Sequence, residues 1–126
     1  MATNRPKVLI VEDDETNLIY LQLVLKDLNI ELLKAVNGQA AVETFEQNQD
    51  IELILMDIRL PGMDGYEATS MIRKMNKDVV IIAQTAYAFS SDKDKAIESG
   101  CNDYVSKPIR REELLKKINH YLNPSV

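Results

Sequence analysis

Five polar residues in this chain are of types that could carry out chemistry together, although they lie far apart in the sequence. Two acids, Glu12 and Asp13, follow one apolar run, and a third acid, Asp57, ends another. Thr85 and Lys107 lie at the ends of two further runs. A carboxylate can act as a nucleophile that takes up a phosphoryl group, and phosphoryl transfer needs mainly positioning and charge neutralisation. The five residues therefore predict a phosphoryl-acceptor site centred on Asp57.

The three acids also favour a bound metal ion. Carboxylates gathered in one pocket repel one another, and without a cation at least one would tend to take up a proton. Because the ligands are all oxygens and no histidine or cysteine stands near them in the sequence, a hard cation is favoured, and Mg²⁺ is the expected cofactor. Together with the metal, the ammonium of Lys107 and the hydroxyl of Thr85 would hold the phosphoryl oxygens.

These residues can meet only if the fold brings several strand ends to one edge. Apolar and β-branched runs predict buried strands at 7–11, 53–57 and 79–85, and shorter strands are expected at 31–36 and 102–106. The strand at 31–36 carries Glu31 and Lys34, which is typical of a sheet edge.

Helices are expected between the strands. Capping residues predict their starts at Asp14, at Asn37–Gly38, at Asp64 with Glu67, and at Ser91 with Asp94. The first helix would place Leu18, Leu21, Leu25 and Leu28 on its inner face, and the fourth would stop at Gly100. The last would run over 112–122 with Leu115, Ile118 and Leu122 facing inward, after a poor capping residue, Arg110.

Strands and helices alternate five times, which predicts an α/β fold with a parallel sheet, right-handed crossovers and two helical layers. We expect a flavodoxin-like, doubly wound (βα)5 sandwich with strand order 2-1-3-4-5. This order would put the first and third strands side by side, and so Glu12 and Asp13 beside Asp57. The length of 126 residues predicts a single domain over 1–126, with a core over about 7–122.

Composition limits the classes of function. A net charge of -5 argues against direct binding to nucleic acid, which would need a basic surface. One cysteine excludes an internal disulfide and fits a reducing compartment. The apolar runs are far too short to span a membrane, and residues 1–6 lack the apolar part of a signal peptide. We therefore expect a soluble, cytoplasmic protein without direct membrane contact.

Four stretches, VLIVEDDETN, LILMDIRLPGMDGYEA, VVIIAQTAYA and GCNDYVSKPI, resemble the response regulator receiver domains of two-component signalling, in particular those of hybrid sensor histidine kinases. The resemblance covers nearly the whole chain. It implies that Asp57 is the phosphoacceptor. It also implies that Asp13, Asp57 and the backbone carbonyl of Arg59 bind Mg²⁺, with Glu12 acting through water. Thr85 and Lys107 would hold the phosphoryl oxygens, helped by backbone N–H groups of Arg59 and Ala86.

The resemblance further implies how the signal passes. The phosphoryl group would come from a partner histidine kinase or histidine phosphotransfer domain, and the chain would be a self-phosphorylating acceptor rather than a turnover enzyme. Thr85 would move toward the phosphoryl group and Tyr104 would turn inward. This would change the face formed by the fourth helix, fifth strand and fifth helix. The changed face would then bind an unknown output partner or form a phosphorylation-dependent dimer. The family pattern also implies a cis peptide between Lys107 and Pro108.

Several alternatives stay open on the residues alone. The chain could be a free-standing regulator, a receiver excised from a hybrid sensor histidine kinase, or a degenerate receiver acting as a scaffold. A flavodoxin-like FMN binder would need a hydroxyl- and glycine-rich loop where Glu12, Asp13 and Asp14 stand. A phosphohydrolase of the haloacid-dehalogenase type would need an acid at Arg59. Tyr87 and Arg59 flank the acceptor, and we hypothesise that they control the access of water. We expect Cys101 to be a buried filler and His120 a surface residue.

Overall fold

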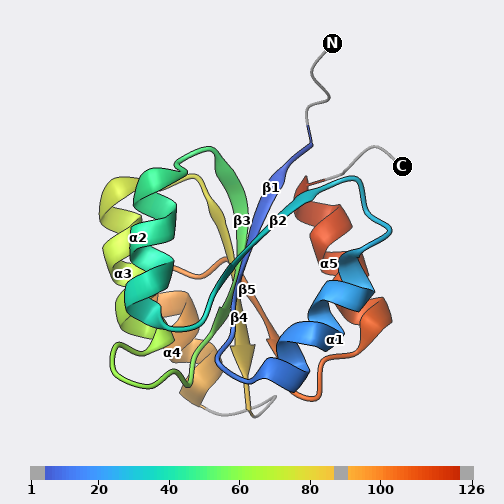
Figure 1. The fold of residues 1–126 in the computed structure, drawn as a ribbon. Helices are drawn as coiled ribbons and strands as arrows, with labels where there is room; N and C mark the ends of the chain where they lie inside the picture. Colours follow the sequence, from blue (N-terminus) through green and yellow to red (C-terminus); the bar gives the residue numbers. More distant parts are fainter. Residues whose placement is uncertain (1–4, 87–90, 123–126) are drawn as a thin grey trace.

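The computed structural model describes residues 5–86 and 91–122, which form alternating strands and helices (Figure 1). The strands are β1 (Lys7–Val11), β2 (Glu31–Ala35), β3 (Ile51–Asp57), β4 (Val80–Thr85) and β5 (Asp103–Ser106). The helices are α1 (Glu15–Leu25), α2 (Gly38–Gln47), α3 (Gly65–Met75), α4 (Ser91–Ser99) and α5 (Arg111–Leu122). Among the described residues, no helix is both long and apolar enough to cross a bilayer.

The sheet is parallel and its strand order is β2-β1-β3-β4-β5, which confirms the predicted topology. The register aligns Val11 with Met56, and Asp57 with Gln84. Because all strands run in one direction, their carboxyl ends share one rim of the sheet. The residues that follow β1, β3 and β4 therefore come together there.

Two apolar layers fill the space between the sheet and its helices. In Figure 1, α2, α3 and α4 lie on one side of the sheet, and α1 and α5 on the other. Successive strand residues face opposite layers, so that Leu9 and Ile54 pack toward α2–α4 around Phe45. Val8, Leu53 and their neighbours pack toward α1 and α5. A central strand buried on both faces explains the unbroken apolar runs in the sequence.

Three helix starts confirm the predicted caps. The side chain of Asp14 accepts from the backbone N–H of Thr16 (3.3 Å), and that of Asp64 from the N–H of Glu67 (2.9 Å). Asn37 caps α2 in the same way. The predicted end of α4 is also observed. Gly100 follows its last residue with a φ of 118°, a left-handed conformation that glycine adopts without a steric penalty.

The last helix differs in part from its prediction. It begins at Arg111, and the carbonyl of Arg110 accepts from the N–H of Leu114 at 3.0 Å. Leu114 and Ile118, four residues apart, are its fully buried residues, whereas Leu115 is only half-buried. The predicted Leu115 and Leu122 do pack against the core beside Ile118, whereas Leu114 was not singled out, because adjacent leucines leave the phase of the helix undetermined. α1 ends at Leu25, so Leu28 packs against the same core from beyond the helix.

Gly65, the first residue of α3, should be required by packing rather than by its backbone conformation. A Cβ at this position would collide with the carbonyl of Asp57 and come within 2.8 Å of the Ile58 Cα. We expect Gly65→Ala to lower the free energy of unfolding by about 3 kcal/mol, measured by urea denaturation. Gly62→Ala is the control, because a Cβ there meets nothing within 4 Å and only its φ of 74° is unfavourable, at about 1 kcal/mol. Equal losses would contradict this explanation.

Candidate functional site

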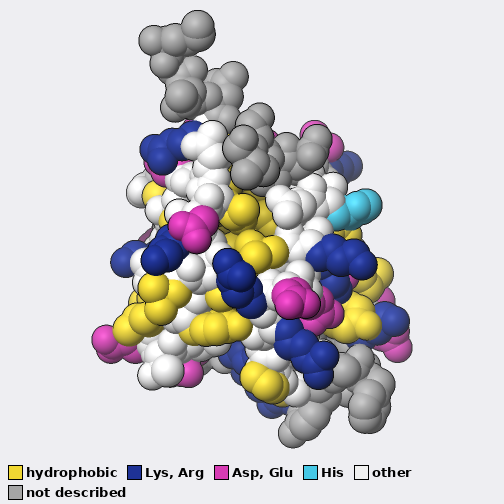
Figure 2. All heavy atoms as spheres, turned by 90° about the vertical axis from the view of Figure 1, so that its right-hand side faces the viewer, with side chains coloured by type: hydrophobic (Ala, Val, Ile, Leu, Met, Phe, Trp, Pro, Cys, Tyr) yellow, Lys and Arg dark blue, Asp and Glu magenta, His cyan; other side chains and the backbone are white. Residues whose placement is uncertain are grey.

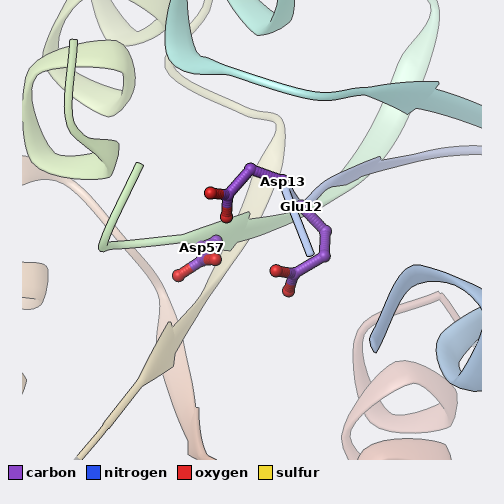
Figure 3. Close-up of side chains that lie close together, drawn as sticks. All are labelled: Glu12, Asp13 and Asp57. Carbon is purple, nitrogen blue, oxygen red and sulfur yellow. The ribbon is translucent and has the colours of Figure 1, made fainter. Parts of the chain in front are cut away.

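Three acidic side chains meet where β1 and β3 end (Figure 3). Glu12 and Asp13 follow β1, and Asp57 is the last residue of β3. One carboxylate oxygen from each lies within 4.8 Å of the others. Glu12 and Asp57 are 1% and 2% exposed, whereas Asp13 is exposed to solvent. The cluster is therefore a partly closed site that solvent reaches beside Asp13, and its all-oxygen donor set suits a hard divalent cation.

Lys107 supplies the positive charge at this site. Its Nζ donates to Asp57 Oδ2 at 3.0 Å and lies 3.4 Å from Glu12 Oε1. Burial alone would lower the pKa of Lys107, but the hydrogen bond to Asp57 and the two negative charges outweigh burial and raise it. The ammonium thus stays charged at neutral pH. The Lys107–Pro108 peptide is cis, as the resemblance implied.

The carboxylate of Asp57 is held on both oxygens. Oδ1 accepts from the backbone N–H of Arg59 at 3.0 Å, and Oδ2 accepts from Lys107. The loop after Asp57 is itself tied down, since the N–H of Ile58 donates to the carbonyl of Gln84 (3.2 Å) and that of Gly65 to the carbonyl of Ile58 (3.0 Å). A carboxylate with such fixed partners is oriented before any reaction begins.

Glu12 is the most deeply buried of the acids. Burial raises the pKa of Glu12, the neighbouring charge of Asp57 raises it further, and the hydrogen bonds from Asn17 and Asp14 act in the opposite direction. Asp14 donates its N–H to Oε2 (3.1 Å), and the Asn17 amide donates to Oε1. A raised pKa means that the anion of Glu12 is disfavoured in the folded protein, and a bound cation would remove that penalty.

Thr85 lies at the same rim, and Tyr104 lies further back on the neighbouring strand β5. Thr85 ends β4 and is 1% exposed, and its hydroxyl donates to the carbonyl of Val105 on β5 at 3.4 Å. Tyr104 is half-buried, with the ammonium groups of Lys93 and Lys117 at 5.3 and 4.8 Å from its ring centroid. Tyr87 lies outside the described residues.

Arg59 has contacts that its position in the sequence did not reveal. Its guanidinium lies 3.7 Å from Asp92 Oδ2, and the hydroxyl of Tyr66 donates to the same carboxylate at 3.0 Å. Burial raises the pKa of Tyr66, and the hydrogen bond to Asp92 adds to the effect. These residues and Asp13 line a hollow of about 590 Å³ beside the acids. The loop after Asp57 is thereby joined to the first turn of α4.

Two polar residues, Asn17 and Gln84, were missed by the sequence analysis. Gln84 is 1% exposed and its side chain accepts from the Asn17 amide at 3.3 Å. A polar residue inside a buried apolar strand was the available signal. Cys101 is buried with its Sγ 3.7 Å from Thr69 Oγ1, and His120 is exposed, both as expected.

Residues 8–119 match the family model of the response regulator receiver domain. The chain belongs to this family. Over 123 residues it is 35% identical to the sensor protein GacS of Pseudomonas syringae pv. syringae. The matched region covers 94% of this chain but only 14% of GacS. The chain therefore spans a small part of this curated relative.

Solved receiver structures superpose closely. The receiver domain of a Pseudomonas aeruginosa sensor histidine kinase, with a magnesium ion coordinated in its active site cleft, is 35% identical with a TM-score of 0.86, covering 94% of this chain and 98% of that one. A co-crystal structure of Saccharomyces cerevisiae histidine phosphotransfer protein Ypd1 and the receiver domain of response regulator Ssk1 matches at 37% identity and a TM-score of 0.88, covering 96% and 91%. The predicted family and fold are thus confirmed.

The contact between Lys107 and Asp57 should stabilise the metal-free protein. We expect Lys107→Met to lower the free energy of unfolding by about 2 kcal/mol without divalent ions, because two buried carboxylates lose their counter-charge. In an Asp57→Asn background the same substitution should cost about half as much, since one of the two anions is gone. Urea denaturation in EDTA measures both values. Lys116→Met, at an exposed position on α5, serves as the control, and equal losses in both backgrounds would contradict the pairing.

Proposed function

We propose that this chain is a phosphoacceptor receiver that takes a phosphoryl group on Asp57 from a phosphohistidine of a histidine kinase or phosphotransfer domain. The observation that carries the proposal is a buried, oriented Asp57 placed between two further acids and the ammonium of Lys107. In the transfer, a bond forms between an Asp57 oxygen and phosphorus, while the phosphorus–nitrogen bond breaks and its electron pair returns to the imidazole. The N–H of Arg59 and the Lys107 ammonium, which both donate to the Asp57 carboxylate, would hold the phosphoryl oxygens.

The residues present fit Mg²⁺, and we propose it as the cofactor. Asp13, Asp57 and the backbone carbonyl of Arg59 would hold the ion, with Glu12 acting through water. When bound, the ion would neutralise charge on the acids and on the phosphoryl oxygens. Support comes from the three carboxylates, which each place an oxygen within 4.8 Å of the others and so form an all-oxygen donor set.

Switching would begin at two of the described contacts. Thr85 would exchange its hydrogen bond to the Val105 carbonyl for one to the phosphoryl group, and the Tyr104 ring would then turn inward. That movement would take the ring away from the ammonium groups of Lys93 on α4 and Lys117 on α5. The face formed by α4, β5 and α5 would therefore carry the change to an output partner or to a second copy.

The donor would dock on α1. Ile19, Tyr20 and Leu23 are 50%, 37% and 58% exposed on this helix. Of these three residues, Tyr20 also lines a groove of about 640 Å³ together with residues 108–113, which directly follow Lys107. Figure 2 shows this side of the molecule, where hydrophobic side chains alternate with charged ones. A mixed apolar and charged surface next to the acceptor suits a transient protein partner.

We further propose that residues 1–126 form one receiver domain with its core over about 7–122, and that the chain acts as an acceptor without catalytic turnover. We also propose that the chain is a module of a hybrid kinase rather than a free-standing regulator. Its similarity to a small part of each of several sensor kinases supports this proposal. Cys101, a buried free thiol, supports the proposed cytoplasmic location.

Acetyl phosphate should phosphorylate the purified protein once. We expect intact-mass measurement to show one added phosphoryl group with Mg²⁺, none with EDTA, and none in Asp57→Asn, which lacks the nucleophilic oxygen. Asp103→Asn, an acid on β5 away from the pocket, should behave like the parent. A phosphorylated Asp57→Asn variant would refute the assignment, and sustained release of phosphate from a generic phosphomonoester would favour the phosphohydrolase alternative.

The proposed docking helix predicts a donor-specific defect. The variant Ile19→Ala/Leu23→Ala should receive phosphoryl groups from a phosphorylated histidine phosphotransfer domain about tenfold more slowly, because it loses apolar contact area. Its reaction with acetyl phosphate should be unchanged, since that donor needs no docking surface. Rapid-quench measurement of both rates separates the two effects. Met71→Ala, at an exposed apolar position on α3, is the matched control. Equal slowing with both donors would argue against docking on α1.

A further inference from the structure

Gln84 carries a buried amide in an otherwise apolar layer. It lies two residues after Ile82 on β4, so that its side chain faces the layer between the sheet and α1. Burying an amide is unfavourable unless its polar atoms are hydrogen-bonded. Its Nε2 donates to the carbonyls of Val11 (3.4 Å) and Leu55 (3.5 Å), and its Oε1 accepts from Asn17 Nδ2 (3.3 Å). The amide therefore connects β1, β3 and α1.

These contacts set the direction of the whole hydrogen-bond chain. A backbone carbonyl only accepts, so the Gln84 NH₂ must point at Val11 and Leu55, and its oxygen must point at Asn17. The Gln84 side-chain oxygen and the Glu12 carboxylate are likewise hydrogen-bond acceptors and cannot donate. The Asn17 NH₂ is therefore forced to face both, and it donates to Glu12 Oε1. A flipped Asn17 amide would place its oxygen against two acceptors.

Glu12 Oε1 has a second partner that the reaction removes. Lys107 Nζ lies 3.4 Å from this oxygen and 3.0 Å from Asp57 Oδ2. When Lys107 turns to a phosphoryl group on Asp57, Oε1 would lose a donor while remaining buried, and a buried carboxylate oxygen without a donor is costly. The Asn17 amide keeps that oxygen paired throughout, and the N–H of Asp14 does the same for Oε2.

We propose that Gln84 and Asn17 form an amide relay that orients the Glu12 carboxylate toward the metal and leaves Lys107 free to follow the phosphoryl group. Both are positioning residues, because they act through Glu12. The inference rests on the proposed function, in which Glu12 assists Mg²⁺ binding. Groups that orient the ligands of a metal typically change its affinity by about 10- to 100-fold when they are removed.

The test compares Mg²⁺ dissociation constants from calorimetric titration of the full chain. Asn17→Ala should weaken Mg²⁺ binding about tenfold. Gln84→Met, which keeps the volume and loses the amide, should weaken it by a smaller factor. In the relay, Gln84 reaches the Glu12 carboxylate through Asn17, so the double variant should bind Mg²⁺ no more weakly than Asn17→Ala. Val24→Ala, a buried position on the same helix, should lower stability and leave the Mg²⁺ affinity unchanged.

A second readout follows the amides directly. In ¹⁵N-labelled parent protein, Mg²⁺ should shift the side-chain NH₂ resonances of Asn17 and Gln84, and leave those of Gln39, which donates to Glu43 on the exposed surface of α2, in place. In Gln84→Met, the Asn17 side-chain proton that was hydrogen-bonded to Gln84 should resonate further upfield than in the parent. Asn17→Ala keeps the test independent of folding defects, because alanine is favourable in a helix and this position is only half-buried.

The outcomes separate the relay from the function beneath it. Unchanged Mg²⁺ affinity in Asn17→Ala, or an additive loss in the double variant, would overturn the relay even if Asp57 is phosphorylated normally. A parent that binds Mg²⁺ and shows the expected variant effects, but takes no phosphoryl group on Asp57, would refute the proposed function and leave the relay standing. A parent that binds no Mg²⁺ would overturn both.

Discussion

Two carboxylates that are almost fully buried side by side are the constraint on which this molecule depends. Glu12 follows β1 and Asp57 ends the neighbouring strand β3, and two buried carboxylates this close together need a compensating positive charge. Lys107 provides that charge from across β4 and contacts both acids. The same unfavourable arrangement is what makes the site receptive, because a divalent cation entering beside Asp13 would relieve repulsion that the fold has already imposed.

The topology explains how such distant residues can be held together. A parallel sheet collects the carboxyl ends of β1, β3, β4 and β5 on one rim, and the crossover helices carry the chain back each time. These strand ends therefore contribute their functional groups, two of them from β1, without distorting the core beneath them. The backbone of α3 comes so close to Asp57 at Gly65 that the position of this helix and that of the acceptor are linked.

Most of the fold, and the residues gathered at the site, could be predicted from the sequence. Uninterrupted apolar runs located the central strands, and short polar caps located Asp14, Asn37 and Asp64. Prediction failed at Leu114, which was not singled out as buried because the adjacent Leu115 leaves the phase of the helix undetermined. It also failed at Asn17 and Gln84, because an amide has no charge to mark its role and its partners are separated by up to 73 positions along the chain. The hydrogen bond from the Thr85 hydroxyl to the Val105 carbonyl could not be predicted either, because it depends on how β4 and β5 pack in three dimensions.

The Tyr104 ring lies close to ammonium groups from two separate helices, and this has an electrostatic consequence. The negative face of the aromatic ring partly offsets the charges of Lys93 and Lys117, which otherwise stand on the same surface. Lys117 is also paired with Asp103 at 2.9 Å, so withdrawal of the ring would chiefly uncover Lys93, and the local potential beside α4 would become more positive. A binding partner bearing acidic groups could then sense the state of the molecule through long-range attraction before any contact is made.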